Sequence, residues 1–187
     1  MNVVTAVNQN CGKIQEERAN ELGWDLMELT AHSGARPSHA EWQGKIVSRS
    51  GQKGYLSLDD IGYGTATGFK GINCRHDWHP YHKGSTRAYT QKELNKWKTE
   101  KVTYNRKEIS MYEATQKQRY FERKIRQDKK NLKAQQAILT SNNKDINIEE
   151  VQTEIRNIKA TQRQHNAQLN DFLNQTRLRK DNSRLVI

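Results

Sequence analysis

The sequence contains no long hydrophobic run. Only 33% of its 187 residues are apolar, and its mean hydropathy is −1.08. A membrane-spanning helix needs about 20 consecutive apolar residues, and the opening residues, MNVVTAVNQNCGK, lack the apolar core of a signal peptide. We therefore expect a soluble, intracellular chain that makes no contact with a membrane.

Cysteine is also scarce. Cys11 and Cys74 are the two cysteines of the chain, which is too few for a disulfide framework. In a reducing cytosol we expect free thiols or a metal ligand.

The second half of the chain has neither glycine nor proline. All 11 Gly and both Pro lie at or before residue 84, as do both Cys and five of the six His. Lys and Arg exceed Asp and Glu by one over residues 1–90 and by ten over residues 91–187. This asymmetry predicts an α+β fold in two parts: a compact, turn-rich module over residues 1–88 and a basic helical tail over residues 89–187.

Apolar residues of the tail recur at helical spacing. One stripe runs from Tyr104 to Leu139 and includes the polar members Gln118 and Asp128, and a second runs from Ile148 to Phe172. They predict helices over roughly 106–140 and 148–180, joined by a turn at 141–147, as a helical hairpin or two coiled-coil segments. Because both stripes are narrow, we expect these helices to need a partner for stability, and that partner could be a second copy of the chain.

The first module reads as a small α+β unit. We expect a polar helix over 14–22, strands over 24–31 and 44–49, a short helix that begins at Pro37, and an extended segment over 74–81.

The stretch HSGARPSHAEWQGK, residues 32–45, carries the first candidate site. His32 and His39 could serve as general acid and base while Arg36 stabilises a phosphate charge, which is the equipment of a metal-independent nuclease or a toxin-like effector. In the alternative, structural interpretation, His39 and Trp42 pack on the sheet and Arg36 holds a loop through backbone carbonyls.

A second candidate site lies in the extended segment. Cys74, His76, His79 and His82 are ligand types that zinc prefers. Their spacing is more compressed than in ordinary zinc sites, so Cys11 or His32 would have to fold back to complete the set. Our expectation is therefore no cofactor, a buried thiol and surface imidazoles, with zinc as the alternative.

Two further features have competing interpretations. The glycines of GYGTATGFKG, residues 62–71, resemble a phosphate-binding loop, but no helix pattern follows them, so they indicate close backbone packing instead. A basic run in the first tail helix could bind nucleic acid or an acidic partner, or form a solvated face. It comprises Lys117, Arg119, Arg123, Lys124, Arg126, Lys129, Lys130 and Lys133.

Four blocks carry a family resemblance: TAHSGARPSHAEWQGKI, GYGT, NCRHDWHPYHKG and YEATQKQRYFERKIR. They resemble the phage minor capsid protein 2 family and, more distantly, head morphogenesis proteins of the Mu F type. The resemblance covers residues 11 to about 130 and implies a low-copy virion protein, made beside the portal protein and incorporated in the head during assembly. It implies no catalytic role for His32, Arg36, His39 or Cys74. Relatives have a helical region before the first block, where only 31 residues stand here, as expected of a truncated or split member.

The leading hypothesis is therefore a minor capsid or head-assembly protein of a tailed bacteriophage that requires no catalysis. We expect it in the host cytoplasm during assembly and then in the head, with other head proteins, the portal and packaged DNA as partners. The alternatives are the nuclease or toxin-like effector, with His32, His39 and Arg36, and a non-specific DNA-binding accessory protein.

Overall fold

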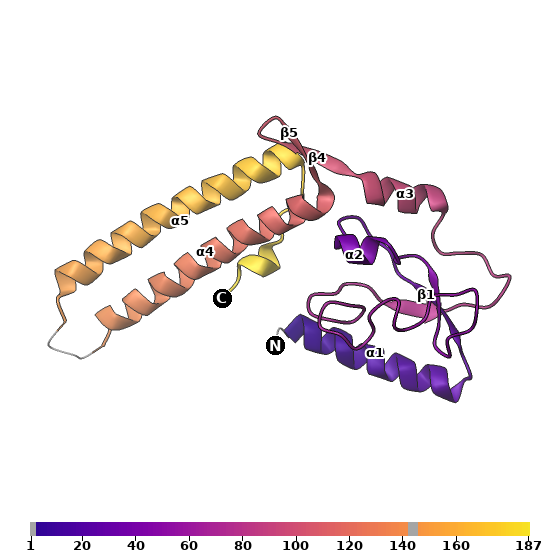
Figure 1. The fold of residues 1–187 in the computed structure, drawn as a ribbon. Coiled ribbons are helices and arrows are strands. Elements are labelled where there is room, and N and C mark those ends of the chain that lie inside the picture. The colour runs from indigo at the N-terminus through magenta and orange to yellow at the C-terminus, as the bar shows by residue number, and fades with distance from the viewer. Residues whose placement is uncertain (1–2, 142–145) are drawn as a thin grey trace. The chain divides into compact units, whose positions relative to one another are not determined.

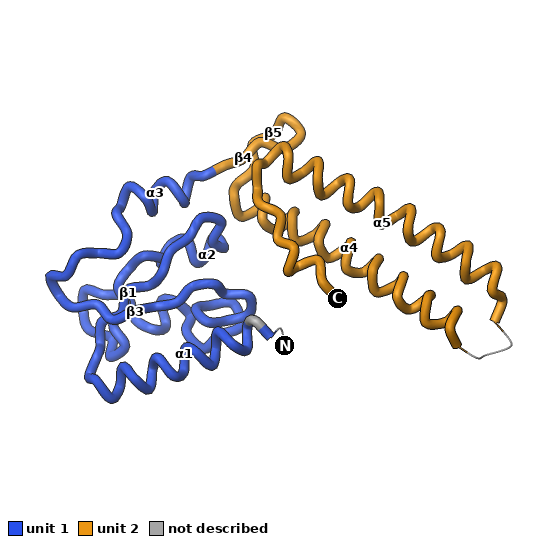
Figure 2. The backbone as a smooth tube through the Cα atoms, turned by 180° about the vertical axis from the view of Figure 1, so that it is seen from behind, with its two compact units in different colours: residues 1–100 blue, residues 101–187 orange. Residues whose placement is uncertain are grey.

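The computed structural model describes residues 3–141 and 146–187 and divides into two compact units, Met1–Glu100 and Lys101–Ile187 (Figure 2). Within the described residues, no helix is long and apolar enough to cross a bilayer. The mixed α+β class expected from the sequence is confirmed, with small sheets in both units and two long helices in the second.

Unit 1 is built on a three-stranded antiparallel sheet (Figure 1). Strand β1 (Leu26–Leu29) lies at the centre, between β2 (Ile46–Ser48) and β3 (Trp78–Pro80). Helix α1 (Val3–Glu21) precedes the sheet, α2 (Pro37–Ala40) lies between β1 and β2, and α3 (Gln91–Thr99) ends the unit. The long connection from β2 to β3 is largely irregular, apart from a bridge between Val47 and Leu56.

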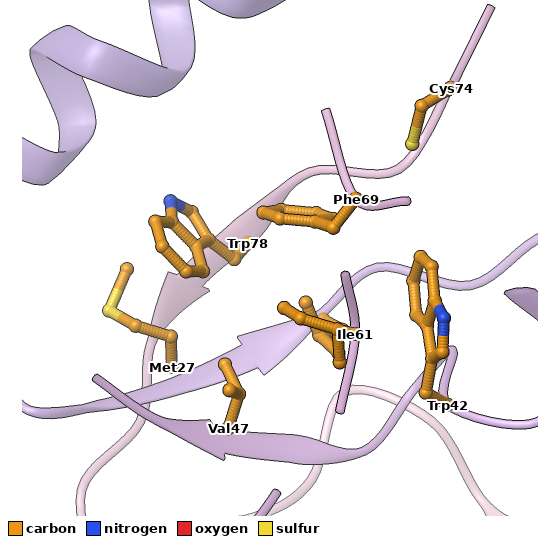
Figure 3. Packing of buried hydrophobic residues seen from close by; sticks show 8 residues of the cluster. Met27, Trp42, Val47, Ile61, Phe69, Cys74 and Trp78 are labelled. Atoms are coloured by element: carbon orange, nitrogen blue, oxygen red, sulfur yellow. The ribbon is translucent and has the colours of Figure 1, made fainter. Parts of the chain in front are cut away.

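One face of this sheet carries the core of unit 1 (Figure 3). Side chains of a strand alternate between its two faces, so Met27 and Leu29 point into the core while Glu28 points away from it. The buried cluster consists of Met27, Leu29, Trp42, Val47, Ile61, Phe69, Cys74 and Trp78. The irregular connection therefore supplies three of these eight residues, Ile61, Phe69 and Cys74, to the core of a unit with a very small sheet.

The buried carboxylate of Glu28 fastens the segment that leads to α3. Arg87 Nε donates to Glu28 Oε1 over 2.9 Å, and the backbone N–H of Ala88 donates to the same carboxylate over 3.2 Å. Arg87 also donates to the carbonyl of Gly44. These bonds keep residues 87–99 with unit 1, so the structural division falls after Glu100 rather than near residue 88, where the composition changes.

Unit 2 begins with a β-hairpin. Residues 107–110, which the apolar spacing placed in the first tail helix, form its second strand. Strands β4 (Lys101–Tyr104) and β5 (Lys107–Ser110) pair antiparallel, and Asn105 and Arg106 both have positive φ in the two-residue turn. Ser110 then caps the next helix, because its side chain accepts from Glu113 N while the Glu113 carboxylate accepts from Ser110 N. The first tail helix therefore begins at Met111.

The two long helices of unit 2 lie side by side (Figure 1). They are α4 (Met111–Leu139) and α5 (Ile148–Thr176), and the 3-10 helix η1 (Asn182–Leu185) follows them. Asn147 caps α5 by accepting from Glu150 N; most of the turn expected over 141–147 lies outside the described residues. Phe121 and Phe172 pack across the pair with ring centroids 5.7 Å apart.

The polar members of the α4 stripe are buried together with its apolar members. Gln118 Nε2 donates to Glu122 Oε1 over 2.9 Å and to the carbonyl of Arg179 over 3.0 Å. Asp128 Oδ2 lies 2.6 Å from His165 Nδ1 of α5. The helix pair is therefore held partly by a polar seam, which explains why its stripes look narrow in the sequence.

The first testable prediction concerns the core of unit 1. Trp42 is 6% exposed and packs edge-on against Phe69, with ring centroids 5.9 Å apart. We expect Trp42→Ala to lower the free energy of unfolding by about 3–5 kcal/mol, because it leaves a large cavity. Chemical denaturation followed by the fluorescence of the remaining tryptophans measures this. Trp97→Ala, at a half-buried position on α3, is the control with the smaller loss, and a loss below about 1 kcal/mol at Trp42 contradicts the packing.

The second prediction concerns the seam of unit 2. Burial raises the pKa of Glu122, opposed in part by Arg184 and by the Gln118 hydrogen bond. A raised pKa means that the folded chain binds this proton more tightly than the unfolded chain, so the contribution is favourable at low pH and is lost as pH rises through the folded pKa. We expect Glu122→Gln to be more stable than the wild type at neutral pH, and this gain to shrink in acid.

Denaturation of the full chain, followed by circular dichroism at several pH values, tests this expectation because α4 and α5 contribute most of the helical signal. Glu154→Gln is the control at an exposed carboxylate of α5. Equal stability of Glu122→Gln and the wild type at every pH would show that burial imposes no cost on this carboxylate.

A buried histidine and cysteine cluster as candidate functional site

Three buried side chains that can bind a metal meet beside the core of unit 1. They are His39, Cys74 and His76, which are 3%, 5% and 1% exposed. His39 comes from α2, where Pro37 occupies the first turn and the N–H of His39 bonds to the carbonyl of Arg36. Cys74 and His76 come from the irregular segment that leads into β3, and Figure 3 shows Cys74 at the edge of the apolar cluster, near Phe69.

The donor atoms of the three residues form a small triangle. His39 Nδ1 lies 3.4 Å from His76 Nδ1, and Cys74 Sγ lies 3.9 Å from the first nitrogen and 3.7 Å from the second. The three atoms thus face one another across a space the size of one ion.

Hydrogen bonds at the far side of each ring identify the protonated nitrogen. His39 Nε2 lies 2.8 Å from the carbonyl oxygen of Thr67, and His76 Nε2 lies 3.1 Å from Oε1 of Gln43. That Gln43 oxygen also accepts the backbone N–H of His32 over 3.1 Å, so it is an acceptor here too. Both Nε2 atoms therefore carry hydrogen, and in the neutral rings both Nδ1 atoms present lone pairs to each other.

Burial keeps these rings neutral. It lowers the pKa of His76 to about 3 and lowers that of His39 as well, where the Thr67 carbonyl partly opposes the shift. Burial also raises the pKa of the Cys74 thiol, although backbone N–H groups of His76 and Lys70 bond to its sulfur and favour the thiolate. The cluster therefore holds two ring lone pairs and a single S–H proton, so it has more acceptors than donors.

The residues of the nuclease hypothesis take part in interactions within the unit. Arg36 donates to the carbonyls of Thr67 over 2.9 Å and Ile72 over 3.2 Å. His32 Nδ1 lies 2.9 Å from the carbonyl of Ser33, and its ring stacks on His76 with centroids 4.5 Å apart. With His39 buried, this is the arrangement that the structural alternative describes: an arginine that holds a loop and a histidine packed beside Trp42.

The structure brings together only two of the four zinc candidates named from the sequence. Trp78 of β3 faces the core, so the next residue, His79, lies on the opposite face, where Nε2 is 3.5 Å from Glu28 Oε2. His82 is exposed, and so is Cys11 on α1. The third residue of the cluster is instead His39. It lies 35 residues before Cys74, so no local pattern in the sequence predicts that the two meet.

The glycine-rich connection packs against its own backbone. Gly62 and Gly64 have positive φ, and a Cβ atom at Gly68 would come within 2.0 Å of the carbonyl oxygen of Gly62. The loop thus needs glycine for close backbone packing, and an irregular segment rather than a helix follows it.

The basic run of α4 divides between different sides of the helix. Arg119, Arg123, Arg126, Lys130 and Lys133 follow one another at intervals of four and three residues, so they share one face, on the far side of the helix from the buried Phe121 and Asp128. Lys117 and Lys124 lie over the rings of Tyr104 and Tyr120, and Lys129 donates to the carbonyl of Leu185 over 2.6 Å. We call the five-residue set the basic stripe.

Comparisons with known proteins agree with the sequence blocks. The chain is 30% identical over 148 residues to a structural protein of Lactococcus phage LL-H, a match that covers 75% of this chain and 37% of that protein. It is 37% identical over 89 residues to a structural protein of Lactococcus phage mv4, which covers 47% of this chain and 63% of that protein. The chain thus spans less than two thirds of either relative.

No solved structure matches the chain significantly. The family model for phage minor capsid protein 2 matches residues 1–174, which include α1, the buried cluster and nearly all of α5. The chain therefore belongs to the phage minor capsid protein 2 family.

Proposed function

We propose that this protein is incorporated in the phage head as an assembly component, and that α1 supplies its contact with another head protein. The observation that carries this proposal is an apolar stripe at the surface of α1. Val3, Val7 and Ile14 are 76%, 55% and 64% exposed and share one face of the helix, while Thr5 and Ala19 on the opposite face are buried. Exposed apolar side chains that gather on one face are typical of a surface that another protein covers.

Polar contacts help to hold this helix against the rest of unit 1, which leaves the exposed Val3, Val7 and Ile14 for another role. Tyr63 donates to Glu16 over 2.7 Å, Lys70 donates to Asn8 over 3.0 Å, and Asn8 donates to the carbonyl of Cys74 over 3.0 Å. These contacts hold α1 in a fixed orientation with Val7 outward, as a preorganised docking surface requires.

A third prediction tests this assembly role. In particles purified from infected cells, mass spectrometry should detect the chain at a constant ratio to the major head protein. Val7→Asp should reduce that ratio at least several-fold, because burying an unpaired charge in an interface is costly. Lys13→Asp, also on α1 but outside the stripe, is the control that should remain incorporated. Absence of the wild-type chain from finished particles would overturn the proposal.

A second proposal follows from the basic stripe of α4, which is suited to the phosphate backbone of packaged DNA. Between Lys117 and Lys133 the only acidic residues are Glu122 and Asp128, and both are buried, where Gln118 and His165 contact them. No exposed carboxylate therefore lies along α4 between Lys117 and Lys133. Such a surface binds phosphates by releasing counterions and without reading bases.

The fourth prediction measures this contact as a function of salt. The full chain should bind double-stranded DNA with an affinity that falls as salt rises, and Arg123→Gln with Lys130→Gln should flatten the logarithmic slope by about 2, since each phosphate contact contributes about 0.9. The matched control is Lys117→Gln with Lys124→Gln, which removes the same charge from another side of α4 and should change the slope less. Equal effects of the two pairs would show that net charge, rather than the stripe, determines binding.

A further inference from the structure

The donor triangle of His39, Cys74 and His76 matches the geometry of a tetrahedral zinc centre. With Zn–N distances of about 2.05 Å and a Zn–S distance of about 2.3 Å, tetrahedral angles place two nitrogens about 3.4 Å apart and a nitrogen and a sulfur about 3.6 Å apart. The corresponding separations here are 3.4 Å, 3.7 Å and 3.9 Å. A zinc ion fits if the sulfur moves toward His39 by a few tenths of an ångström.

The hydrogen-bond pattern around the triangle is the one that metal-bound histidines require. A ligating imidazole usually donates its other N–H to a carbonyl or carboxylate, which fixes the tautomer and the orientation of the ring. His39 donates in this way to Thr67 O, and His76 to Gln43 Oε1. The two Nδ1 atoms that remain are unprotonated and point at each other in a buried space.

Without a cation, this arrangement has fewer hydrogen-bond donors than acceptors. One S–H of Cys74 can donate to only one of the two facing nitrogens, so the other lone pair has no donor within the triangle. Leaving a buried polar atom without a partner costs about 1–3 kcal/mol. Adding a proton is disfavoured because it would create a buried charge without solvation.

We propose that His39 Nδ1, Cys74 Sγ and His76 Nδ1 bind one Zn²⁺ ion, which fastens helix α2 to the irregular segment before β3. On binding, the thiol loses its proton, so that one thiolate and two neutral imidazoles share the ion and one H⁺ passes to solvent. These three donors leave one of the four tetrahedral positions for a further ligand.

Lys70 and Arg36, the two positive side chains that favour the thiolate of Cys74, already have hydrogen-bond partners of their own. Lys70 Nζ lies 2.7 Å from Asp77 Oδ1 and 3.0 Å from Asn8 Oδ1, and Arg36 donates to two backbone carbonyls. Both side chains favour the thiolate form of Cys74, which is the form that binds zinc. Burial still raises the pKa of the thiol, so the lysine and the arginine offset only part of the cost of losing the proton.

Such an ion would matter for the stability of unit 1. Residues 49–77 contain no strand or helix apart from short turns and bridges, so this stretch has few backbone bonds of its own to hold it against α2. Because the folded chain would bind the ion and the unfolded chain would not, the free energy of binding adds to the free energy of unfolding.

The fifth prediction is a metal titration of the full chain, prepared without an affinity tag and treated with a chelator. Co²⁺ should bind with one ion per chain and produce a thiolate-to-metal charge-transfer band together with the visible bands of tetrahedral cobalt. Zn²⁺ should displace the cobalt, release one proton per chain in unbuffered solution and raise the midpoint of thermal unfolding.

Matched variants locate the site. Cys74→Ser should abolish the charge-transfer band, whereas Cys11→Ser, which removes the exposed cysteine, should leave it unchanged. His76→Gln should lower Zn²⁺ affinity at least tenfold, as ligand loss does, and His82→Gln should not. A wild-type chain that folds and yields no thiolate band would overturn the proposal, even where a variant fails to fold. A band lost in Cys11→Ser and kept in Cys74→Ser would also overturn it.

Discussion

The architecture of unit 1 depends on Arg36, which immediately precedes α2, and on His39 of α2, because both donate hydrogen bonds to the backbone of a long irregular connection. Backbone carbonyls in an irregular segment have no strand or helix partner, and here Arg36 donates to those of Thr67 and Ile72 while His39 also donates to that of Thr67. These bonds hold in place the segment that contributes Phe69 and Cys74 to the core. A sheet of three short strands could not otherwise bury so many aromatic rings, so the histidine-rich block acts first as part of the framework.

This framework explains why a candidate metal site occurs where it does. The ring nitrogens that do not bond to Thr67 and Gln43 must point the other way, and there they meet the sulfur of Cys74. Interior positions beside Trp42 and Phe69 exclude water, so the three donors have each other or an ion as partners. Structural support and the proposed metal affinity thus follow from the same set of side-chain orientations.

In helix α4 of unit 2, buried carboxylates and exposed basic residues alternate along the same segment. Carboxylates such as Glu122 and Asp128 lie in the seam, where Gln118 and His165 contact them, and lysines and arginines of the basic stripe lie outward. A helix that buried only apolar residues would need a wider stripe than this sequence has. The polar seam therefore stabilises the pair and leaves Arg123, Lys130 and Lys133 of the basic stripe exposed.

The sequence by itself determined the α+β class, the two long tail helices and the family, because helical periodicity, chain breakers and the order of short sequence blocks can all be read along the chain. Its expected strands over 24–31 and 44–49 contain β1 and β2, whereas the apolar periodicity placed the start of the first tail helix before the Ser110 cap that the structure shows. Only the tertiary structure decided which histidines meet Cys74. Strand alternation turns His79 toward Glu28, and chain reversal brings His39 to within 3.4 Å of His76. Such contacts join residues more than thirty positions apart, and their geometry is set by packing that no local pattern records.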